Sequence, residues 1–225
     1  GALPEGIVLG NGSNDVLELV ARAFLTREDS AVYAQHAFMV YALAVQAIGA
    51  THVEVPAKAY GHDLAAMAAA IRPDTKIVFL ANPNNPTGTF LPWGEIEAFL
   101  AKVPPEVLVV IDEAYGEYLP PDKASPAAGW LARFPNLVLS RTLSKAYGLA
   151  GLRVGFGLAH PEVAELMNRV RQPFNVNHLA MVAAEAALGD EAFIAESRAM
   201  NAAGLAQLEA GFRQLGLGFI PSSGN

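Results

Sequence analysis

The stretch Val107-Leu108-Val109-Val110-Ile111-Asp112 decides how this chain folds. Five consecutive aliphatic residues predict a β-strand, and the lack of alternating polar residues indicates that both of its faces are buried. Such strands are typical of parallel sheets that carry helices on both faces. The carboxylate of Asp112 is costly to bury at the end of this strand unless it meets a partner, which makes it a candidate functional group. A structural turn or helix cap is the alternative reading of Asp112.

The same alternation of short aliphatic runs and longer helical patterns extends along the chain. Strands are predicted at residues 31–34, 52–55, 76–81, 107–112, 137–140 and 153–159. Helices are predicted at residues 15–24, 40–48, 64–71, 93–102, 126–134, 161–170, 177–188 and 191–215. The order predicts a three-layer α/β/α sandwich with a mostly parallel sheet and right-handed crossovers. Residues 215–220 read as the start of another strand, and the alanine-rich residues 181–188 as a closely packed helix face.

Composition narrows the class of protein. The chain has 225 residues, 52% of them hydrophobic, which predicts one large domain over residues 1–225. A net charge of −7 argues against nucleic acid as a partner. No apolar run reaches the length of a membrane span, and no signal peptide is recognisable. The chain has no cysteine, which excludes disulfides and fits a cytoplasmic protein. Both ends read as cut, so we expect a piece of a longer protein.

Polar clusters follow three of the predicted strands. Residues 82–88 follow the first, Asp112-Glu113-Ala114-Tyr115 ends the second, and Thr142-Leu143-Ser144-Lys145 follows the third. In open α/β sheets, ligands bind beyond the carboxyl ends of the strands. The three clusters are therefore expected to meet in one site.

Lys145 is the most reactive candidate in these clusters. Apolar residues, Arg141 and Arg153 surround it in sequence, and such surroundings favour the neutral amine. A neutral amine is a nucleophile that forms a Schiff base with a carbonyl. The hydroxyls of Thr142 and Ser144, with the bidentate fork of Arg153, suit a phosphate. A lysine beside a phosphate site suggests pyridoxal 5'-phosphate. The alternatives are a solvated surface lysine and a surface ion pair of Arg153.

Other residues have a functional and a structural reading. Gly10-Asn11-Gly12-Ser13-Asn14 precedes a helix and suits an anion, but it also fits a plain helix cap. Asn85, within Asn82-Pro83-Asn84-Asn85-Pro86-Thr87-Gly88, offers an amide to an aromatic oxygen or simply belongs to a turn. Tyr115 suits the same oxygen or an interface, and Phe38 suits a stacked ring or the core. The five histidines lack metal-ligand spacing.

Taken in order, these motifs resemble the class I/II aminotransferases of the fold-type I pyridoxal-phosphate enzymes. The resemblance runs from about Pro4 to the end and includes Ala150-Gly151-Leu152-Arg153 and Arg171-Gln172-Pro173-Phe174-Asn175-Val176-Asn177. Within the family, the chain looks like the histidinol-phosphate aminotransferases. The family implies two substrates, an amino donor and a 2-oxo acid, here L-histidinol phosphate and 2-oxoglutarate in histidine biosynthesis.

The resemblance also implies a role for each matching residue. Lys145 would be the Schiff-base lysine and proton shuttle, Asp112 would pair the pyridine nitrogen, and Asn85 and Tyr115 would hold the phenolic oxygen. Phe38 would stack on the ring, where the family often has tyrosine. The phosphate would be held by Gly12, Ser13, Asn14, Thr142, Ser144 and Arg153. Asn14 stands where the family often has an acidic residue, and its backbone N–H is expected to matter more than its side chain.

Other features that the family implies lie outside this chain. They are a small domain with the substrate-carboxylate arginine, and a homodimer in which a partner tyrosine reaches the phosphate. Three alternatives stay open. These are a threonine-phosphate decarboxylase, an aromatic-amino-acid aminotransferase, and the aminotransferase-like sensor domain of a transcription regulator. The acidic balance gives the last of these no support.

Overall fold

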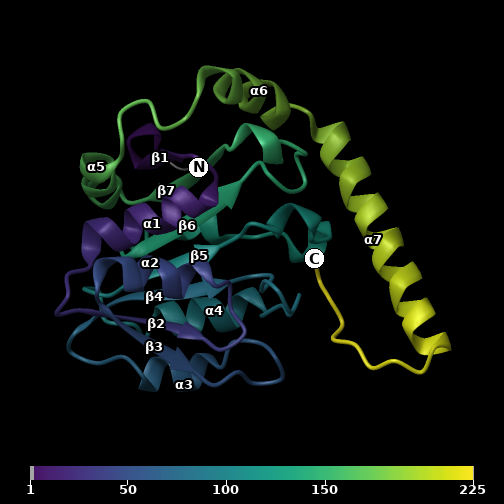
Figure 1. Cartoon of the computed structure of the whole chain (residues 1–225), viewed down its shortest axis with the longest axis horizontal. Helices are drawn as coiled ribbons and strands as arrows, with labels where there is room; N and C mark the ends of the chain where they lie inside the picture. The colour runs from purple at the N-terminus through teal and green to yellow at the C-terminus, as the bar shows by residue number, and fades with distance from the viewer. Residues whose placement is uncertain (1–2, 225) are drawn as a thin grey trace.

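The computed structural model describes residues 3–224, and its centre is one seven-stranded sheet (Figure 1). The strand order is β1-β7-β6-β5-β4-β2-β3. The strands are β1 (Ile7–Gly10), β2 (Ser30–Ala34), β3 (Thr51–Val55), β4 (Thr75–Ala81), β5 (Leu108–Asp112), β6 (Leu137–Thr142) and β7 (Gly155–Ala159). All neighbouring strands pair in parallel except where β7 meets β1 and β6. The prediction of a mostly parallel α/β sheet is confirmed.

Helices cover both faces of this sheet. They are α1 (Ser13–Phe24), α2 (Val40–Ile48), α3 (Leu64–Ala69), α4 (Trp93–Leu100), α5 (Pro161–Val170), α6 (His178–Leu188) and α7 (Glu191–Gln214). One apolar cluster joins α1, α2 and α5 to the first face, and a second joins α3 and α4 to the other. Strand β5 shows the cause, because successive side chains of a strand point to opposite faces. Val110 lies in the first cluster, and Val109 and Ile111 lie in the second.

Strand β7 runs against its neighbours, which the predicted crossovers do not anticipate. The connection from β6 to β7 contains only a single turn of 3-10 helix, Ala150–Leu152. A parallel return needs a longer crossover, usually a complete α-helix, so the chain comes back antiparallel. This short connection carries Lys145 and Arg153.

Three other sequence-based expectations are wrong. Strand β1 is absent from the predicted strands, because it has only four residues and is defined by its pairing with β7. Residues 126–134 do not form an α-helix but a short 3-10 helix, Ala127–Trp130, in which Gly129 lowers helix propensity. Residues 215–220 form no strand, because no described strand lies beside them to pair with.

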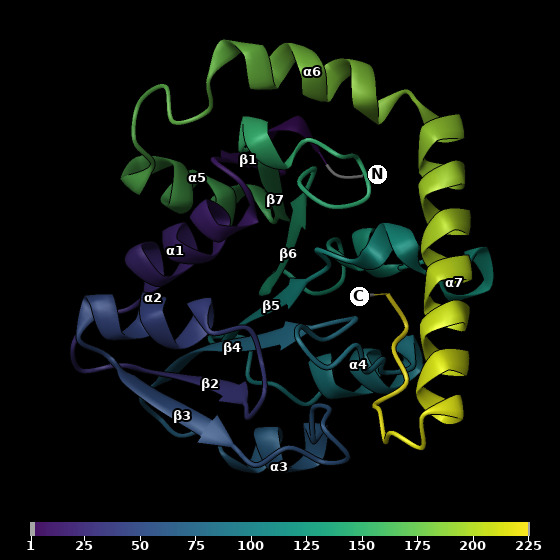
Figure 2. The same cartoon turned by 45° about the vertical axis from the view of Figure 1, so that its right-hand side comes forward.

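Helices α6 and α7 lie at the periphery of the molecule (Figure 2). Of the residues of α6 only Ala180 is buried, and none of α7 is. The prediction that residues 181–188 form a closely packed face is therefore wrong for this chain. After α7 the tail turns back toward the sheet, where the Ser223 N–H donates to the Gly88 carbonyl at 2.8 Å.

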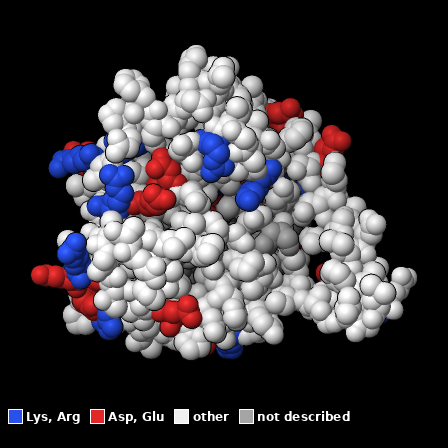
Figure 3. All heavy atoms as spheres, in the orientation of Figure 1, with Lys and Arg blue, Asp and Glu red and all other residues white. Residues whose placement is uncertain are grey.

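Charged side chains are scattered on the surface that Figure 3 shows, with both signs interspersed. The face carries no single broad area of Lys and Arg. Among the helices that the structure describes, none combines the length and hydropathy needed to cross a membrane.

Candidate functional site

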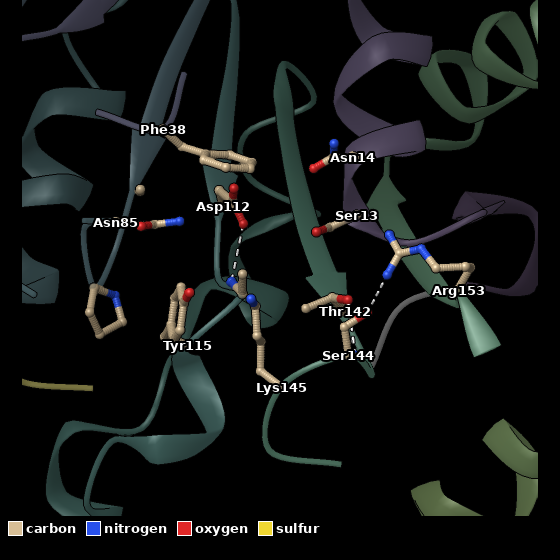
Figure 4. Close-up of a pocket in the computed structure, with 13 residues that line it drawn as sticks. Ser13, Asn14, Phe38, Asn85, Asp112, Tyr115, Thr142, Ser144, Lys145 and Arg153 are labelled. Carbon is tan, nitrogen blue, oxygen red and sulfur yellow. Dashed lines mark hydrogen bonds between the residues drawn. The ribbon is translucent and has the colours of Figure 1, made fainter. Parts of the chain in front are cut away.

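The carboxyl ends of β4, β5 and β6 meet the start of α1 around one pocket (Figure 4). The pocket brings together residues that are far apart in sequence: Ser13, Asn14, Phe38, Ala81, Pro83, Asn85, Asp112, Ala114, Tyr115, Thr142, Ser144, Lys145 and Arg153. Ten of the eleven predicted site residues are among them, and the eleventh, Gly12, adjoins Ser13. The predicted convergence of the three clusters at strand ends is thus what the structure shows.

Asp112 is buried at the centre of this pocket, and 5% of its surface is exposed. Its Oδ2 accepts a hydrogen bond from the Tyr41 hydroxyl at 3.0 Å, and its Oδ1 accepts one from the Ala114 N–H at 3.1 Å. Burial raises the pKa of Asp112 to about 6, against the two hydrogen bonds, which favour the carboxylate. Burial outweighs these hydrogen bonds and the nearby Lys145 amine, which acts in the same direction, so the carboxylate would be stabilised further by a cationic ligand atom.

Tyr41 is the residue that the sequence analysis missed here. It is fully buried in α2 and stacks on Phe79 of β4, with ring centroids 4.9 Å apart. The packing fixes its hydroxyl at Asp112, although 71 positions separate the two residues in sequence. Burial, and then the nearby Asp112 carboxylate, raise the pKa of Tyr41 well above its ordinary value, so it acts as a donor. Tyrosine in an apolar helix reads as core, and nothing local marks this contact.

The loop after β4 contains three asparagine side chains, Asn82, Asn84 and Asn85, which make different contacts. Asn82 is braced against Leu91, to whose carbonyl it donates and from whose N–H it accepts. Asn84 donates to the His36 carbonyl at 3.0 Å and to the Thr87 hydroxyl at 2.7 Å. Asn85 makes no hydrogen bond within the described residues, and its amide faces the pocket (Figure 4). The structural reading of this loop therefore holds for Asn82 and Asn84, and Asn85 is free for a ligand.

Lys145 and Phe38 approach Asp112 from opposite sides (Figure 4). The Lys145 Nζ lies 5.3 Å from the centroid of the Tyr115 ring. The Lys145 side chain is exposed in this chain, and Phe38 is half-buried. A flat ligand over Asp112 would have the amine on one side and an aromatic face on the other.

Arg153 and the hydroxyls form the other end of the pocket. The Arg153 Nη1 donates to the Ser144 Oγ and to the Ala150 carbonyl, both at 3.1 Å. Gly12, at φ +87°, leaves the space for this guanidinium, because a Cβ there would lie 2.4 Å from the Arg153 Nη2. The first N–H groups of α1, at Ser13 and Asn14, have no partner of their own in a helix and suit an anion.

Arg141 does not join the cations around Lys145, which corrects the sequence-based reading. Arg141 precedes Thr142 on β6, so its side chain leaves the sheet on the opposite face. It pairs there with the buried Glu113, with its Nη2 2.7 Å from the Oε2 of that carboxylate. Glu113 also accepts a short hydrogen bond from the Ser125 hydroxyl. This ion pair joins the ends of β5 and β6 behind the pocket.

Gly155 is a second residue that the sequence analysis missed. A Cβ at this first residue of β7 would lie 2.6 Å from the Ser13 nitrogen and 2.7 Å from the Arg141 oxygen. Both are backbone atoms, which cannot move away cheaply. We expect Gly155→Ala to lower the free energy of unfolding by about 1–3 kcal/mol in urea denaturation. Gly204→Ala is the control, since nothing lies within 4 Å of its added Cβ, and it should be neutral or stabilise the protein. Equal behaviour of the two variants would contradict the close approach.

The raised pKa of Asp112 predicts how stability changes with pH in the ligand-free protein. Between about pH 6 and pH 4, the folded state holds a proton at Asp112 that the unfolded state releases, so Asp112 costs stability above this window and not below it. His62 acts in the opposite direction, because burial lowers its pKa to about 4. We therefore expect Asp112→Asn to stabilise the ligand-free protein at pH 7 by up to about 3 kcal/mol, a gain that disappears near pH 4. A gain that is the same at both pH values in urea denaturation would contradict this.

No group of three or more histidine or carboxylate side chains that could hold a metal ion occurs in residues 3–224. The donors of the pocket suit an organic anion instead. They offer one amine, one buried carboxylate and a cluster of hydroxyls with an arginine.

Several known proteins are similar to this chain in sequence and in shape. Residues 3–225 match the model of the family "Aminotransferase class I and II". The chain is 62% identical to histidinol-phosphate aminotransferase 2 of Ralstonia nicotianae, over 99% of this chain and 60% of that protein. It superposes on the histidinol-phosphate aminotransferase of Sinorhizobium meliloti, solved with pyridoxal 5'-phosphate, with a TM-score of 0.94 and 32% identity, covering 99% of this chain and 60% of that one.

A decarboxylase is also similar, at a lower level. The threonine-phosphate decarboxylase of Porphyromonas gingivalis gives a TM-score of 0.74 at 26% identity, over 84% of this chain and 58% of that one. This chain spans about three fifths of the length of the histidinol-phosphate aminotransferase of Ralstonia. The match of the family model to nearly every residue shows that the chain belongs to the aminotransferase class I and II family.

Proposed function

We propose that this chain is the cofactor-binding part of a pyridoxal-phosphate-dependent aminotransferase that transfers the amino group of L-histidinol phosphate to 2-oxoglutarate. The observation that carries the proposal is the pocket itself, in which Lys145, Asp112 and Arg153 lie around one space (Figure 4). An amine, a buried acid and an arginine are the groups that a carbonyl, a ring nitrogen and a phosphate require.

Two features of the pocket fit the chemical groups of this cofactor. Asp112 is buried with a raised pKa, so a protonated pyridine nitrogen would stabilise its carboxylate form. The absent Cβ of Gly12 leaves Arg153 room to lie against the start of α1, where backbone N–H groups also point at an anion. When bound, pyridoxal phosphate supplies a carbonyl for an amine and a ring that withdraws electrons.

Lys145 and Asp112 carry the proton transfers in this proposal. The Lys145 amine would hold the cofactor by its carbonyl and, once the amino donor has taken its place, would act as the base at the donor's α-carbon. The protonated amine would then be the acid that delivers this proton to the cofactor. Asp112 would keep a proton at the ring nitrogen, because its carboxylate would pair with the cation there. Tyr41 keeps the carboxylate oriented.

The remaining residues bind and orient the ring. Tyr115 and Asn85 donate hydrogen bonds to the phenolic oxygen. Phe38 covers the face opposite Lys145 and excludes water from it. The phosphate would be bound by Arg153, by the hydroxyls of Ser13, Thr142 and Ser144, and by the N–H groups of Ser13 and Asn14. Gly12 contributes space, because its own N–H donates to the Gly10 carbonyl at 2.8 Å.

The choice of substrate is supported by the named relatives and is tested by comparing donors. We expect the full-length protein with its cofactor to form glutamate from 2-oxoglutarate with L-histidinol phosphate as donor. Transfer from phenylalanine alone would identify an aromatic enzyme. Carbon dioxide released from threonine phosphate would identify the lyase that the Porphyromonas structure represents, and either result would overturn the proposed donor.

We also propose that this chain forms the large domain of a homodimeric enzyme. The large domain is supported by the length of the match, about three fifths of the relative from Ralstonia, and by the pocket that gathers the predicted cofactor residues. The homodimer is what the family resemblance implies. Cross-linking and sedimentation of the full-length protein would test the dimer.

A further inference from the structure

The side-chain amide of Asn175 contacts both sides of the turn that carries Gly12 and Ser13. Helix α1 begins without a side-chain cap, since its N-cap residue is Gly12. The turn therefore cannot be fixed by the usual capping contact. Instead, the Asn175 Nδ2 donates to the Leu9 carbonyl at 3.0 Å, before the turn, and to the Asp15 Oδ2 at 2.7 Å, after it.

Asp15 passes this constraint into the turn. The same Oδ2 that accepts from Asn175 accepts a hydrogen bond from the Asn11 N–H at 2.9 Å. The Asn11 carbonyl in turn lies 3.5 Å from the Arg153 Nη2. The Asn175 amide thus contacts Leu9 of β1 before the turn and Asp15 of α1 after it. Through Asp15 it is also linked to Asn11, whose carbonyl accepts from Arg153.

The opposite side of the Asn175 amide is also fixed. Its Oδ1 accepts from the Arg171 Nη1 at 2.9 Å, and the Arg171 Nε donates to the Asn168 Oδ1 at 2.8 Å. The Nδ2 donor and the Oδ1 acceptor of Asn175 both have partners, so the orientation of this amide is fixed. The preceding residue, Phe174, has φ +58° and is 97% exposed. Its side chain gains almost nothing from packing in this chain, so the contacts of Asn175 and the burial of Val176 must hold the loop.

We propose that Asn175 is a positioning residue for the phosphate of the cofactor, acting through the turn at residues 10–14. The inference rests on the proposed function, because it needs an anion at that turn. A displaced turn would move the Ser13 and Asn14 N–H groups and the Asn11 carbonyl away from their present positions beside Arg153. Binding of the phosphate would weaken, and contacts at Asp112, Tyr115 and Lys145 would remain.

The test separates the phosphate from the rest of the cofactor. Dissociation constants of pyridoxal 5'-phosphate and of pyridoxal, which lacks the phosphate, are measured for the full-length apoprotein. The quantity compared is the dissociation constant of pyridoxal divided by that of pyridoxal 5'-phosphate. In Asn175→Ala we expect this ratio to fall by about tenfold, because the constant for pyridoxal 5'-phosphate rises and that for pyridoxal is unchanged. In Asn175→Asp the ratio should fall further, because a carboxylate would then face Asp15. Binding of inorganic phosphate should weaken in both variants.

Asn136→Ala is the matched control. Asn136 is a buried asparagine whose amide also donates to backbone carbonyls, those of Val107 at 2.8 Å and Pro104 at 3.4 Å. It adjoins the start of β6, away from the pocket. The Asn136→Ala substitution should lower the melting temperature and leave the ratio of the pyridoxal and pyridoxal 5'-phosphate dissociation constants at the wild-type value.

Two results would overturn the inference, and they are distinguishable. If both constants rise together in the Asn175 variants, or if the ratio does not change, the residue has only a structural role. If the wild-type protein binds pyridoxal as tightly as pyridoxal 5'-phosphate, the pocket has no phosphate end, and the proposed function fails together with the role of Asn175.

Discussion

Lys145→Ala should lower the rate of amino transfer by about 10⁴-fold and leave the cofactor non-covalently bound. Among the described residues that line the pocket, Lys145 supplies the one amine. Arg153 stays protonated and cannot replace it as nucleophile or base. Both the covalent attachment and the proton transfer should therefore disappear in a single substitution, which makes this the largest expected effect.

The covalent attachment can be measured separately from turnover. After reduction with borohydride, peptide mass spectrometry should find the pyridoxyl group on Lys145 in the wild-type protein and on no peptide of the variant. Lys123→Ala is the matched control, since Lys123 lies outside the pocket over the ring of Phe90. It should keep both attachment and rate. Attachment at another lysine, or a normal rate in Lys145→Ala, would refute the assignment.

Asp112→Asn should lower the rate of amino transfer by about 10³-fold while the protein stays folded. The amide is nearly isosteric, and its oxygen can accept from the Ala114 N–H while its NH2 donates to the Tyr41 hydroxyl oxygen, so the packing around it is retained. It lacks the charge that would keep a proton on the ring nitrogen. The ring would then withdraw electrons poorly, and removal of the α-proton by Lys145 would slow.

A cofactor with a fixed positive charge provides the control. In Asp112→Ala, a pyridoxal phosphate that carries a methyl group on its ring nitrogen should recover part of the lost rate, because the space left by the carboxyl accepts the methyl group. The wild-type protein should gain nothing from it. Wild-type rates in Asp112→Asn, or no recovery in Asp112→Ala, would show that the charge at this position is not what the reaction uses. The loss of activity should coincide with the gain in stability at pH 7 predicted above for the ligand-free protein.

The fold was predictable where the pattern was local and long enough. Runs of aliphatic residues predict strands such as β4 and β5. Helices α2 and α5 occupy the predicted residues. Strand β1 was missed because its four residues are stabilised by pairing with β7 at the other end of the sequence. The direction of β7 follows from the absence of a crossover helix, which an apolar run does not reveal.

The residues of the site likewise fall into those that local sequence motifs predict and those that depend on distant contacts. Asp112, Lys145 and Asn85 stand in short motifs at strand ends, and the rule for open α/β sheets brings them together. Arg141 was misread because the face on which it leaves β6 depends on the register of the sheet. Tyr41, Gly155 and Asn175 were not recognised, since each acts through contacts with residues distant in sequence. Their roles, like those of the pocket residues, stay predictions for the experiments above.

The short connection between β6 and β7 has a kinetic consequence. The groups proposed to hold the two ends of the cofactor, Lys145 and Arg153, belong to this one loop, and only the single 3-10 turn Ala150–Leu152 intervenes between them. Segments of this size open as a unit in native proteins. A local opening of residues 143–154 would therefore carry both groups away from Asp112 and from the start of α1 in the same event. The bond to Lys145 would survive this opening, so the cofactor would be lost only when water that the opening admits hydrolyses that bond.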